Sequence, residues 1–208
     1  AHLLHKGVDG ENLLAVTFTN KAAREMKERV GQLVGRKRAA TLTISTFHSF
    51  AVRLLRDHGA ALGYSKGFGI ADDEDGRLLL RTALRDLGVP EKEVSPRWGR
   101  WQISLWKNEG LAPDAAADRA ATDAELKLAL AYAKVQEEML KRQVIDFDDM
   151  MMLAARLFSE HEDVLRLARD RYRYMIVDEY QDTNRVQFDI MRALAGGRRN
   201  VAVVGDDD

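Results

Sequence analysis

The sequence contains no cysteine, and this absence excludes several kinds of chemistry. A chain without thiols has no disulfide framework, no thiolate metal site and no cysteine nucleophile. Long hydrophobic runs are missing too, because no stretch approaches the roughly 20 apolar residues of a membrane helix, and no signal-peptide pattern opens the chain. We therefore expect no membrane partner and a cytoplasmic location.

The chain also lacks an excess of either charge. Its 32 basic residues stand against 33 acidic residues, which gives a formal net charge of −1. This balance excludes a protein that coats nucleic acid through bulk positive charge, so any DNA path over the surface must be local. Composition alone fits equally well a neutral protein with no nucleic-acid partner.

The most informative feature that is present is an apolar run, Tyr174–Val177, that ends in Asp178 and Glu179. In phosphoryl-transfer enzymes an Asp in this place can hold Mg²⁺ against nucleotide phosphates, and an adjacent Glu can orient or deprotonate the attacking water. Taken alone, the same letters fit the end of a buried strand followed by two solvated acids. The neighbouring segments decide between these interpretations.

Four segments of the sequence follow the order of a known set of motifs: LLAVTFTNKAAREMKERV at 13–30, TISTFHSF at 43–50, YMIVDEYQDTN at 174–184 and NVAVVGDDD at 200–208. They resemble motif Ia, the DNA-contacting motif after it, the acidic motif and the opening of motif III of superfamily 1 DNA helicases of the UvrD, Rep and PcrA type. The resemblance covers essentially the whole chain. It implies an ATP-dependent DNA helicase that moves 3′-to-5′ on single-stranded DNA.

The resemblance implies ATP and Mg²⁺ as cofactors and gives roles to the acidic motif. It assigns Mg²⁺ coordination to Asp178 and the general base to Glu179, while Gln181 and Asp182 are expected to orient these groups and to couple the site to DNA. The run Asp206–Asp208 either adds negative charge near the site or is merely solvated.

The resemblance also implies single-stranded DNA and duplex junctions as partners, with repair or replication proteins beside them. The implied DNA contacts are Phe18, Thr19, Asn20, Thr46, Phe47 and His48. They follow predicted strands, and open parallel sheets bind ligands at the carboxyl ends of their strands. An aromatic side chain there can stack on any base, although Phe18 can equally be a core residue. A lone His is more often structural, so His48 depends on the motif alone.

Hydrophobic periodicity predicts an α/β fold. Strands are predicted at 13–18, 41–45, 174–177 and 201–204, and helices at 21–30, 47–56, 72–87, 122–142, 163–171 and 185–194. Capping boxes are predicted to open three of these helices, at Thr122, Ser159 and Asn184. The resemblance implies a RecA-like parallel sheet, with residues 1–64 and 144–208 in the motor domain and 65–143 in an inserted, mainly helical subdomain.

The predicted helical subdomain contains all three tryptophans, interleaved with cations in the segment 97–108. Such a segment could stack on DNA and neutralise it. Trp98, Trp101 and Leu105, however, recur at helical spacing, which favours a stripe facing the core, and we give this structural interpretation preference. By the same argument Leu78, Leu79, Ala83 and Leu87 are predicted to share the buried face of the helix at 72–87.

No G-x-x-x-x-G-K-[ST] phosphate loop occurs in these 208 residues. We therefore interpret the chain as an internal part of a larger helicase whose phosphate-loop strand lies outside it. Two alternatives remain open: a module that binds single-stranded DNA or a partner without turning over ATP, and the helicase part of a helicase–nuclease.

Overall fold

The computed structural model describes residues 1–206, so Asp207 and Asp208 of the acidic run considered above lie outside the described residues. The chain forms two compact units, one from Ala1–Leu54 and Ala155–Asp208 and the other from Leu55–Ala154. The sequence-based boundaries at 64/65 and 143/144 both fall inside the second unit. The two units divide within helices α4 (Phe47–His58) and α9 (Phe147–Glu160).

The first unit is built on a four-stranded, entirely parallel sheet. Its strands are β1 (Leu13–Thr17), β2 (Thr43–Thr46), β5 (Tyr174–Val177) and β6 (Val201–Val203), in the order β2-β1-β5-β6. All four strands that the sequence predicts are present. Every residue of β1 is buried, as expected for a central strand of a parallel sheet that is covered on both faces.

Strand β6 departs from its prediction as a buried strand. Among the described residues it pairs only with β5, and Val203 is 49% exposed. A short apolar run predicts a strand, but burial also needs a neighbour on each side, which the run itself does not reveal.

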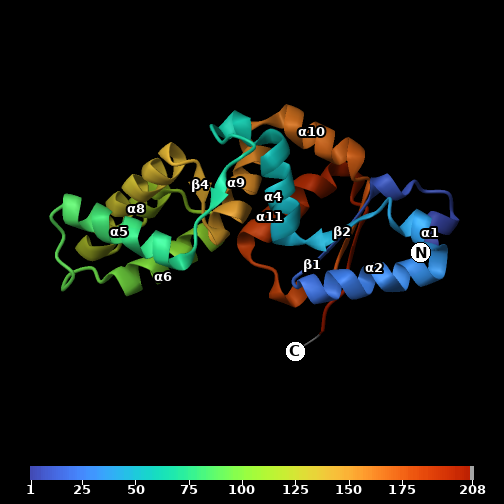
Figure 1. Ribbon diagram of the computed structural model, residues 1–208, viewed down its shortest axis with the longest axis horizontal. Coiled ribbons are helices and arrows are strands. Elements are labelled where there is room, and N and C mark those ends of the chain that lie inside the picture. The colour runs from blue at the N-terminus through green and yellow to red at the C-terminus, as the bar shows by residue number, and fades with distance from the viewer. Residues whose placement is uncertain (207–208) are drawn as a thin grey trace. The chain divides into compact units, whose positions relative to one another are not determined.

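Helices flank the sheet of the first unit. Figure 1 shows α2 along one side of the strands and α10 and α11 on the other. The remaining elements of this unit are the helices α1 (His2–His5), α2 (Asn20–Val34), α3 (Arg36–Ala39), α10 (Glu162–Arg171) and α11 (Arg185–Ala195), and the 3-10 turns at Gly10–Asn12, Tyr180–Asp182 and Gly196–Arg198.

Side chains at the helix ends explain where several of these helices begin. The predicted capping box at Asn184 is present, because Asn184 and Gln187 each accept a hydrogen bond from the backbone of the other. The capping box predicted at Ser159 is wrong. Ser159 lies in the last turn of α9, and α10 begins after His161 without a side-chain cap. A capping residue must have non-helical backbone angles, and the helix that runs through Ser159 prevents this.

The second unit is mainly helical. Its helices are α5 (Asp73–Asp86), α6 (Pro96–Asn108), α7 (Pro113–Asp118) and α8 (Asp123–Lys141), joined by the 3-10 turn Gly59–Leu62 and a two-stranded parallel ribbon of β3 (Gly69–Ile70) and β4 (Val144–Ile145). The predicted capping box at Thr122 opens α8. The core contains Leu80, Ile103, Leu128 and Tyr132, all fully buried. Within the described part of the chain no helix is both long enough and apolar enough to cross a membrane.

The buried face of α6 differs from the prediction, and that of α5 differs at Leu78, whereas Leu79 and Ala83 are buried as predicted. Leu78 is 58% exposed and Trp101 is 57% exposed, whereas α6 buries Ile103, Trp106 and Lys107. Three consecutive leucines in α5 and three tryptophans in α6 allow more than one apolar stripe at helical spacing. In α6 a charged residue, Lys107, lies on the face that is buried, and periodicity counts such a residue as polar.

Candidate functional site

The residues that the sequence analysis connected to ATP and DNA lie at one edge of the sheet. Because the strands are parallel, their carboxyl ends share this edge. Val16 of β1 pairs in register with Val177 of β5 on one side, and Thr17 pairs with Thr46 of β2 on the other. The segments after β1, β2 and β5 therefore begin side by side, which fits the location of ligand sites in open parallel sheets.

Asp178 is the first residue after β5. Its backbone N–H donates to the carbonyl of Val16 at 3.0 Å, which ties this position to the central strand. The side chain is half-buried, and no ion pair or hydrogen bond to its carboxylate is found within residues 1–206. One available carboxylate fits Mg²⁺, which in nucleotide sites is held through one or two carboxylates together with phosphates and water.

Glu179 occupies a left-handed backbone conformation, with φ 54° and ψ 45°. A non-glycine residue in this region is uncommon, and such strain collects at functional sites. The Gln181 side chain donates from Nε2 to Glu179 Oε2 at 2.7 Å, and the Asp182 N–H donates to the Glu179 carbonyl at 3.0 Å. The short 3-10 turn after the acidic pair therefore fixes the direction of the Glu179 carboxylate.

Gly205 approaches this turn closely, a contact that its sequence motif does not indicate. A Cβ atom at Gly205 would lie 2.5 Å from Gln181 Oε1, so only glycine fits without a shift of that side chain. The next residue, Asp206, donates its backbone N–H to the same oxygen at 3.2 Å. Gln181 thus joins the general-base candidate, Glu179, to the segment that follows β6.

The segment after β1 presents Phe18, Thr19 and Asn20. Thr19 is the N-cap of α2, and its Oγ1 accepts from the Ala22 N–H at 3.1 Å. Thr19 and Asn20 are exposed, and Phe18 is half-buried. These side chains follow β1, the strand next to the one that Asp178 follows.

The segment after β2 is more enclosed than its predicted role requires. Phe47 is only 2% exposed, and its ring packs edge to face against Phe18 with centroids 5.6 Å apart. Thr46 is buried, and its Oγ1 accepts from the Ser49 N–H at 3.1 Å at the start of α4. His48 is half-buried. A buried ring has no face for a base, so the geometry gives Phe47 the role of supporting Phe18.

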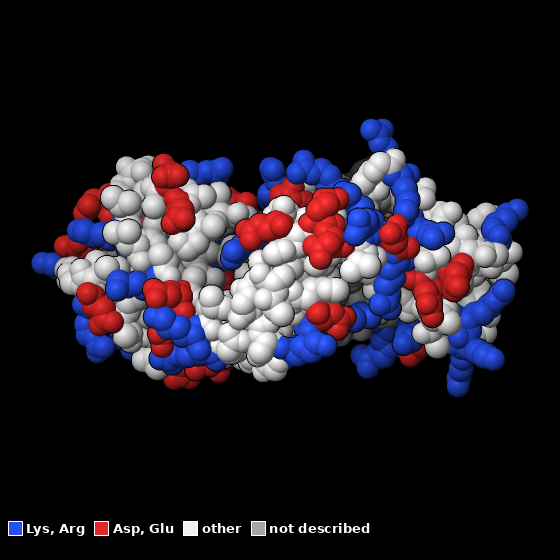
Figure 2. Space-filling model, turned by 90° about the horizontal axis from the view of Figure 1, so that it is seen from above, with Lys and Arg blue, Asp and Glu red and all other residues white. Residues whose placement is uncertain are grey.

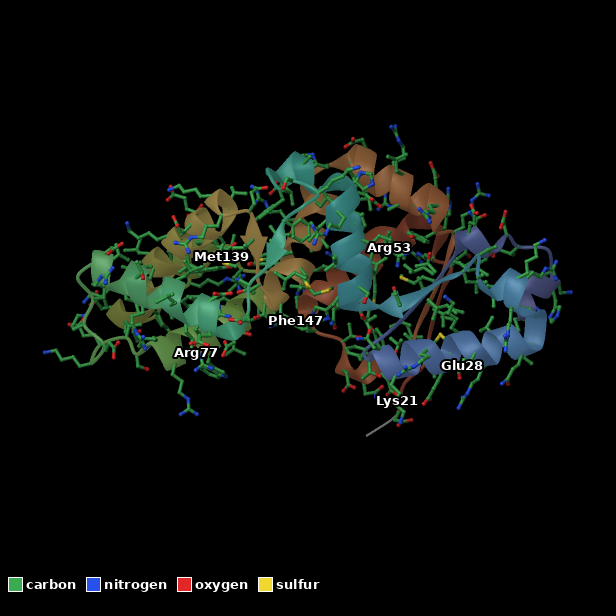
Figure 3. The ribbon with its side chains drawn as sticks, viewed as in Figure 1. Lys21, Glu28, Arg53, Arg77, Met139 and Phe147 are labelled. Atoms are coloured by element: carbon green, nitrogen blue, oxygen red, sulfur yellow. The ribbon has the colours of Figure 1, made fainter. Side chains whose placement is uncertain are left out.

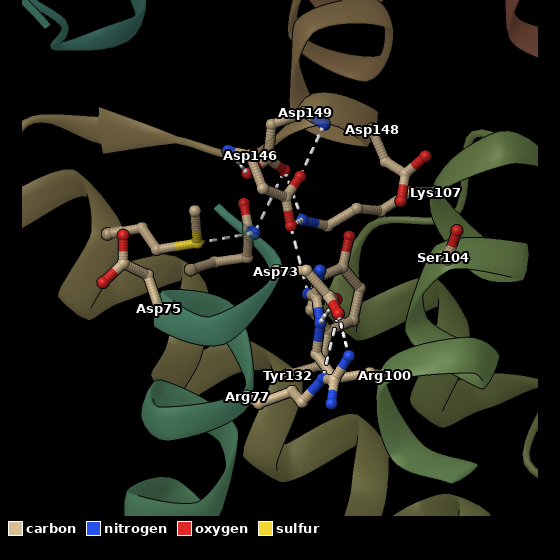
Figure 4. A network of polar contacts seen from close by, with 12 residues as sticks. Asp73, Asp75, Arg77, Arg100, Ser104, Lys107, Tyr132, Asp146, Asp148 and Asp149 are labelled. Atoms are coloured by element: carbon tan, nitrogen blue, oxygen red, sulfur yellow. Dashed lines mark hydrogen bonds and ion pairs between the residues drawn. The ribbon is translucent and has the colours of Figure 1, made fainter. Parts of the chain in front are cut away.

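A second polar cluster, in the helical unit, was not predicted at all. The buried Lys107 ammonium lies 2.7 Å from Asp146 Oδ2 and 2.7 Å from Asp149 Oδ1 (Figure 4). The two aspartates also form a reciprocal pair, since each accepts a hydrogen bond from the backbone N–H of the other at the start of α9. Gln136 and Arg100 complete the cluster, donating to Asp149 and Asp146 at 3.1 Å each.

Burial and charge act against each other in this cluster. Burial raises the pKa of Asp149 to about 6, although the Lys107 ammonium opposes this shift. Burial also acts against ionisation of Asp146, but Lys107 and Arg100 outweigh it and hold the pKa of Asp146 well below its usual range. Burial, together with the nearby carboxylates, raises the pKa of Tyr132, which therefore stays neutral. The sequence signal that could have found the cluster is the acidic run at 146–149, which must be neutralised if it is buried.

The chain is similar to known proteins over nearly its whole length. The chain is 42% identical over 196 residues to the ATP-dependent DNA helicase PcrA of Leuconostoc citreum, covering 94% of this chain and 26% of the relative. It is 40% identical over 209 residues to the ATP-dependent DNA helicase Rep of Escherichia coli (strain K12), covering 100% of this chain and 31% of the relative. The chain thus spans less than a third of the length of these relatives.

The family comparison covers the chain from residue 1 to residue 208. The matching family is described as the UvrD/REP helicase N-terminal domain. Its match accounts for both units, and the parallel sheet with helices fits a RecA-like helicase domain. The chain belongs to the UvrD/REP helicase family.

Proposed function

We propose that this chain is part of the first motor domain of an ATP-driven DNA helicase, in which hydrolysis at Asp178 and Glu179 drives 3′-to-5′ movement along single-stranded DNA. The observation that carries the proposal is the pairing of β1 with β5, which brings the acidic pair and the segment Phe18–Asn20 to adjacent strand ends. The relatives' names, ATP-dependent DNA helicase PcrA and Rep, support the same activity.

The acidic motif supplies the hydrolytic residues. When bound, ATP with Mg²⁺ supplies the phosphoryl group and the positive charge that stabilises its transfer. Asp178 would hold the metal, and Glu179 accepts the proton of the attacking water. Gln181 donates a hydrogen bond to the Glu179 carboxylate and so holds its orientation. Asp182 stabilises the turn by donating its backbone N–H to the Glu179 carbonyl. General-base help of this kind contributes about 10²- to 10⁴-fold in rate.

The segment after β1 supplies the DNA contacts in this proposal. Phe18 stacks on a base, and Thr19 and Asn20 meet the sugar-phosphate backbone beside it. The half-buried His48 extends this path, while the buried Thr46 and Phe47 support it: Thr46 accepts from the Ser49 N–H, and the Phe47 ring packs against Phe18. Stacking is indifferent to base identity, which suits a motor that must pass every sequence.

The hydrolytic assignment is tested in a longer helicase protein that contains this chain and a phosphate loop. Glu179→Gln keeps the shape of the side chain but removes the base, so it should keep nucleotide binding and lower DNA-stimulated ATP turnover by about 10²-fold or more. Asp178→Asn should instead weaken Mg²⁺-nucleotide binding. Glu28→Gln, an exposed site on α2, is the control. Near-normal turnover of Glu179→Gln would refute the assignment.

The DNA assignment is tested by affinity at several salt concentrations. Phe18→Ala should weaken binding of single-stranded DNA by about 1–3 kcal/mol, because a base loses its stacking partner. The salt dependence should stay unchanged. Lys21→Ala should act in the opposite way. If Lys21 neutralises one phosphate, its loss should lower the magnitude of the slope of log affinity against log salt concentration by about 0.7. Unchanged affinity of Phe18→Ala would place this ring in the core.

The organisation and the biological setting complete the proposal. We propose that the mainly helical unit is an insertion within the motor domain, as the helical content of Leu55–Ala154 supports. Duplex junctions as substrates, repair or replication proteins as partners, and a cytoplasmic location belong to the same proposal. Their support is the similarity to PcrA and Rep.

A further inference from the structure

Helix α6 of the helical unit exposes a tryptophan that its core does not use. Trp101 is 57% exposed, while Ile103 and Trp106 of the same helix are buried. Arg97 is also exposed and lies four residues before Trp101, so the two side chains share one face of the helix. An exposed aromatic ring beside a cation is a pattern that binds single-stranded nucleic acid.

The exposed face of α6 forms one wall of a cavity. The cavity has a volume of about 410 Å³, within the range of ligand pockets, and is lined by Arg77, Arg97, Arg100, Trp101, Phe147 and Asp148, among others. Arg77 and Phe147 are labelled in Figure 3. Phe147, the first residue of α9, is 59% exposed. All of the lining residues belong to the helical unit, so the cavity is a property of that unit alone.

Most of the charged side chains around the cavity form ion pairs or hydrogen bonds within the helical unit. Arg100 is 13% exposed and pairs with Asp146 at 3.1 Å, while Arg77 pairs with Asp73. Asp148 accepts a hydrogen bond from Asn108 at 3.1 Å. Arg97, by contrast, makes no ion pair or hydrogen bond within residues 1–206. The cavity therefore has walls fixed by internal contacts and one cation that is available to an incoming phosphate.

The overall surface charge favours such a local contact. Acidic and basic side chains are interspersed over the face shown in Figure 2, in agreement with the net charge of −1. A strand of DNA gains little from bulk attraction to such a surface. It must be held by stacking and by single cations.

We propose that Trp101 stacks on a base of single-stranded DNA and that Arg97 contacts the adjoining phosphate, so that the helical unit has a single-strand contact of its own. This inference rests on the proposed function as far as the ligand is DNA. It adds residues that lie outside the sheet edge and its motifs. The contact is tolerant of sequence, because any base offers a face for stacking.

The test uses the 208-residue chain and an oligothymidylate as the probe. All three tryptophans lie in α6, so intrinsic fluorescence reports on this helix. The oligonucleotide should quench the wild-type emission, and Trp101→Phe should abolish most of the quenching while an aromatic face remains. Trp98→Phe, at a half-buried position of the same helix, is the matched control and should keep the quenching.

Measuring the affinity of the variants for the oligothymidylate at several salt concentrations completes the test. Trp101→Ala should weaken binding by about 5- to 150-fold, the range for loss of one stacked base, without changing the salt dependence. Arg97→Ala should lower the salt slope by about 0.7, as expected for one phosphate contact. Both positions are exposed, so thermal unfolding of the variants should match that of the wild type.

Phe18→Ala, measured in parallel, separates this inference from the proposed function. If Phe18→Ala weakens binding and Trp101→Ala does not, the inference is overturned and the sheet-edge path stands. If Trp101→Ala weakens binding and Phe18→Ala does not, the inference is supported and the sheet-edge path fails. If the wild-type chain neither binds the oligonucleotide nor shows quenching, both are overturned.

Discussion

Replacing Lys107 by methionine should destabilise the helical unit severely. Lys107→Met keeps the length and volume of the side chain but removes the ammonium that lies 2.7 Å from both Asp146 and Asp149. Asp146 retains Arg100 as a partner, whereas Asp149 keeps only neutral hydrogen-bond donors. Removing one partner of a buried ion pair typically costs about 3–5 kcal/mol, because it leaves an uncompensated buried charge.

Protonation limits how much free energy the unpaired Asp149 carboxylate can cost in this variant. The carboxyl can take up a proton instead of staying charged, and each pKa unit corresponds to about 1.36 kcal/mol. From an ordinary pKa of 3.8, protonation costs about 4.4 kcal/mol at pH 7 and about 1.6 kcal/mol at pH 5. The deficit of Lys107→Met should therefore be large at pH 7 and clearly smaller at pH 5.

Urea unfolding followed by tryptophan fluorescence measures this deficit, because all three tryptophans lie in α6. Lys127→Met is the matched control. It makes the same substitution in the same unit but removes only surface ion pairs with Glu93 and Asp123, so it should change stability far less. The double variant Lys107→Met with Asp149→Asn should recover part of the loss at pH 7. A deficit equal at pH 5 and pH 7 would refute the reasoning.

Three further predictions follow from contacts described above. Thr19→Ala removes the acceptor that caps α2 and should lower stability by about 0.5–2 kcal/mol in urea unfolding, whereas Thr19→Ser should not. Gly205→Ala should displace Gln181 and lower kcat more than nucleotide affinity in a longer helicase containing this chain, whereas Gly67→Ala, which has open space, should be neutral. The pKa of Asp149 is about 6 in the folded state, above the ordinary aspartate value of 3.8. The stability that comes from protonating Asp149 is therefore present at low pH and is lost as the pH rises through 6. The stability difference between wild type and Asp149→Asn should shrink from about pH 4.5 to about pH 7.

The elements of the sheet could be predicted because their signals are local. The acidic pair follows an apolar run, and a parallel sheet then brings Asp178 and Phe18 to one edge by its topology alone. The capping boxes at Thr122 and Asn184 are likewise patterns of four residues, and both are present. Local signals of this kind survive folding unless a neighbouring helix overrides them, as it does at Ser159.

Burial could not be predicted to the same degree because it depends on residues far away in the chain. Phe47 is buried by its neighbours in three dimensions, and its motif alone does not indicate this. Lys107 can be buried because Asp146 and Asp149 form ion pairs with its ammonium group. A rule based on the spacing of apolar residues places this lysine at the surface. The exposed face of α6 was assigned wrongly for the same reason, since burying Lys107 turns Trp101 outward.

The Lys107 cluster also has a consequence for how related sequences can diverge. Losing Lys107 alone leaves the buried Asp149 carboxylate without a cationic partner, and a cost of about 3–5 kcal/mol is a large part of the stability of a typical domain. Replacing all three together by well-packed apolar residues carries no such penalty. Both the intact ion-pair cluster and a fully apolar replacement are stable, but the loss of Lys107 alone between them is destabilising. In related sequences, position 107 should therefore lose its positive charge only where position 149 has also lost its negative charge.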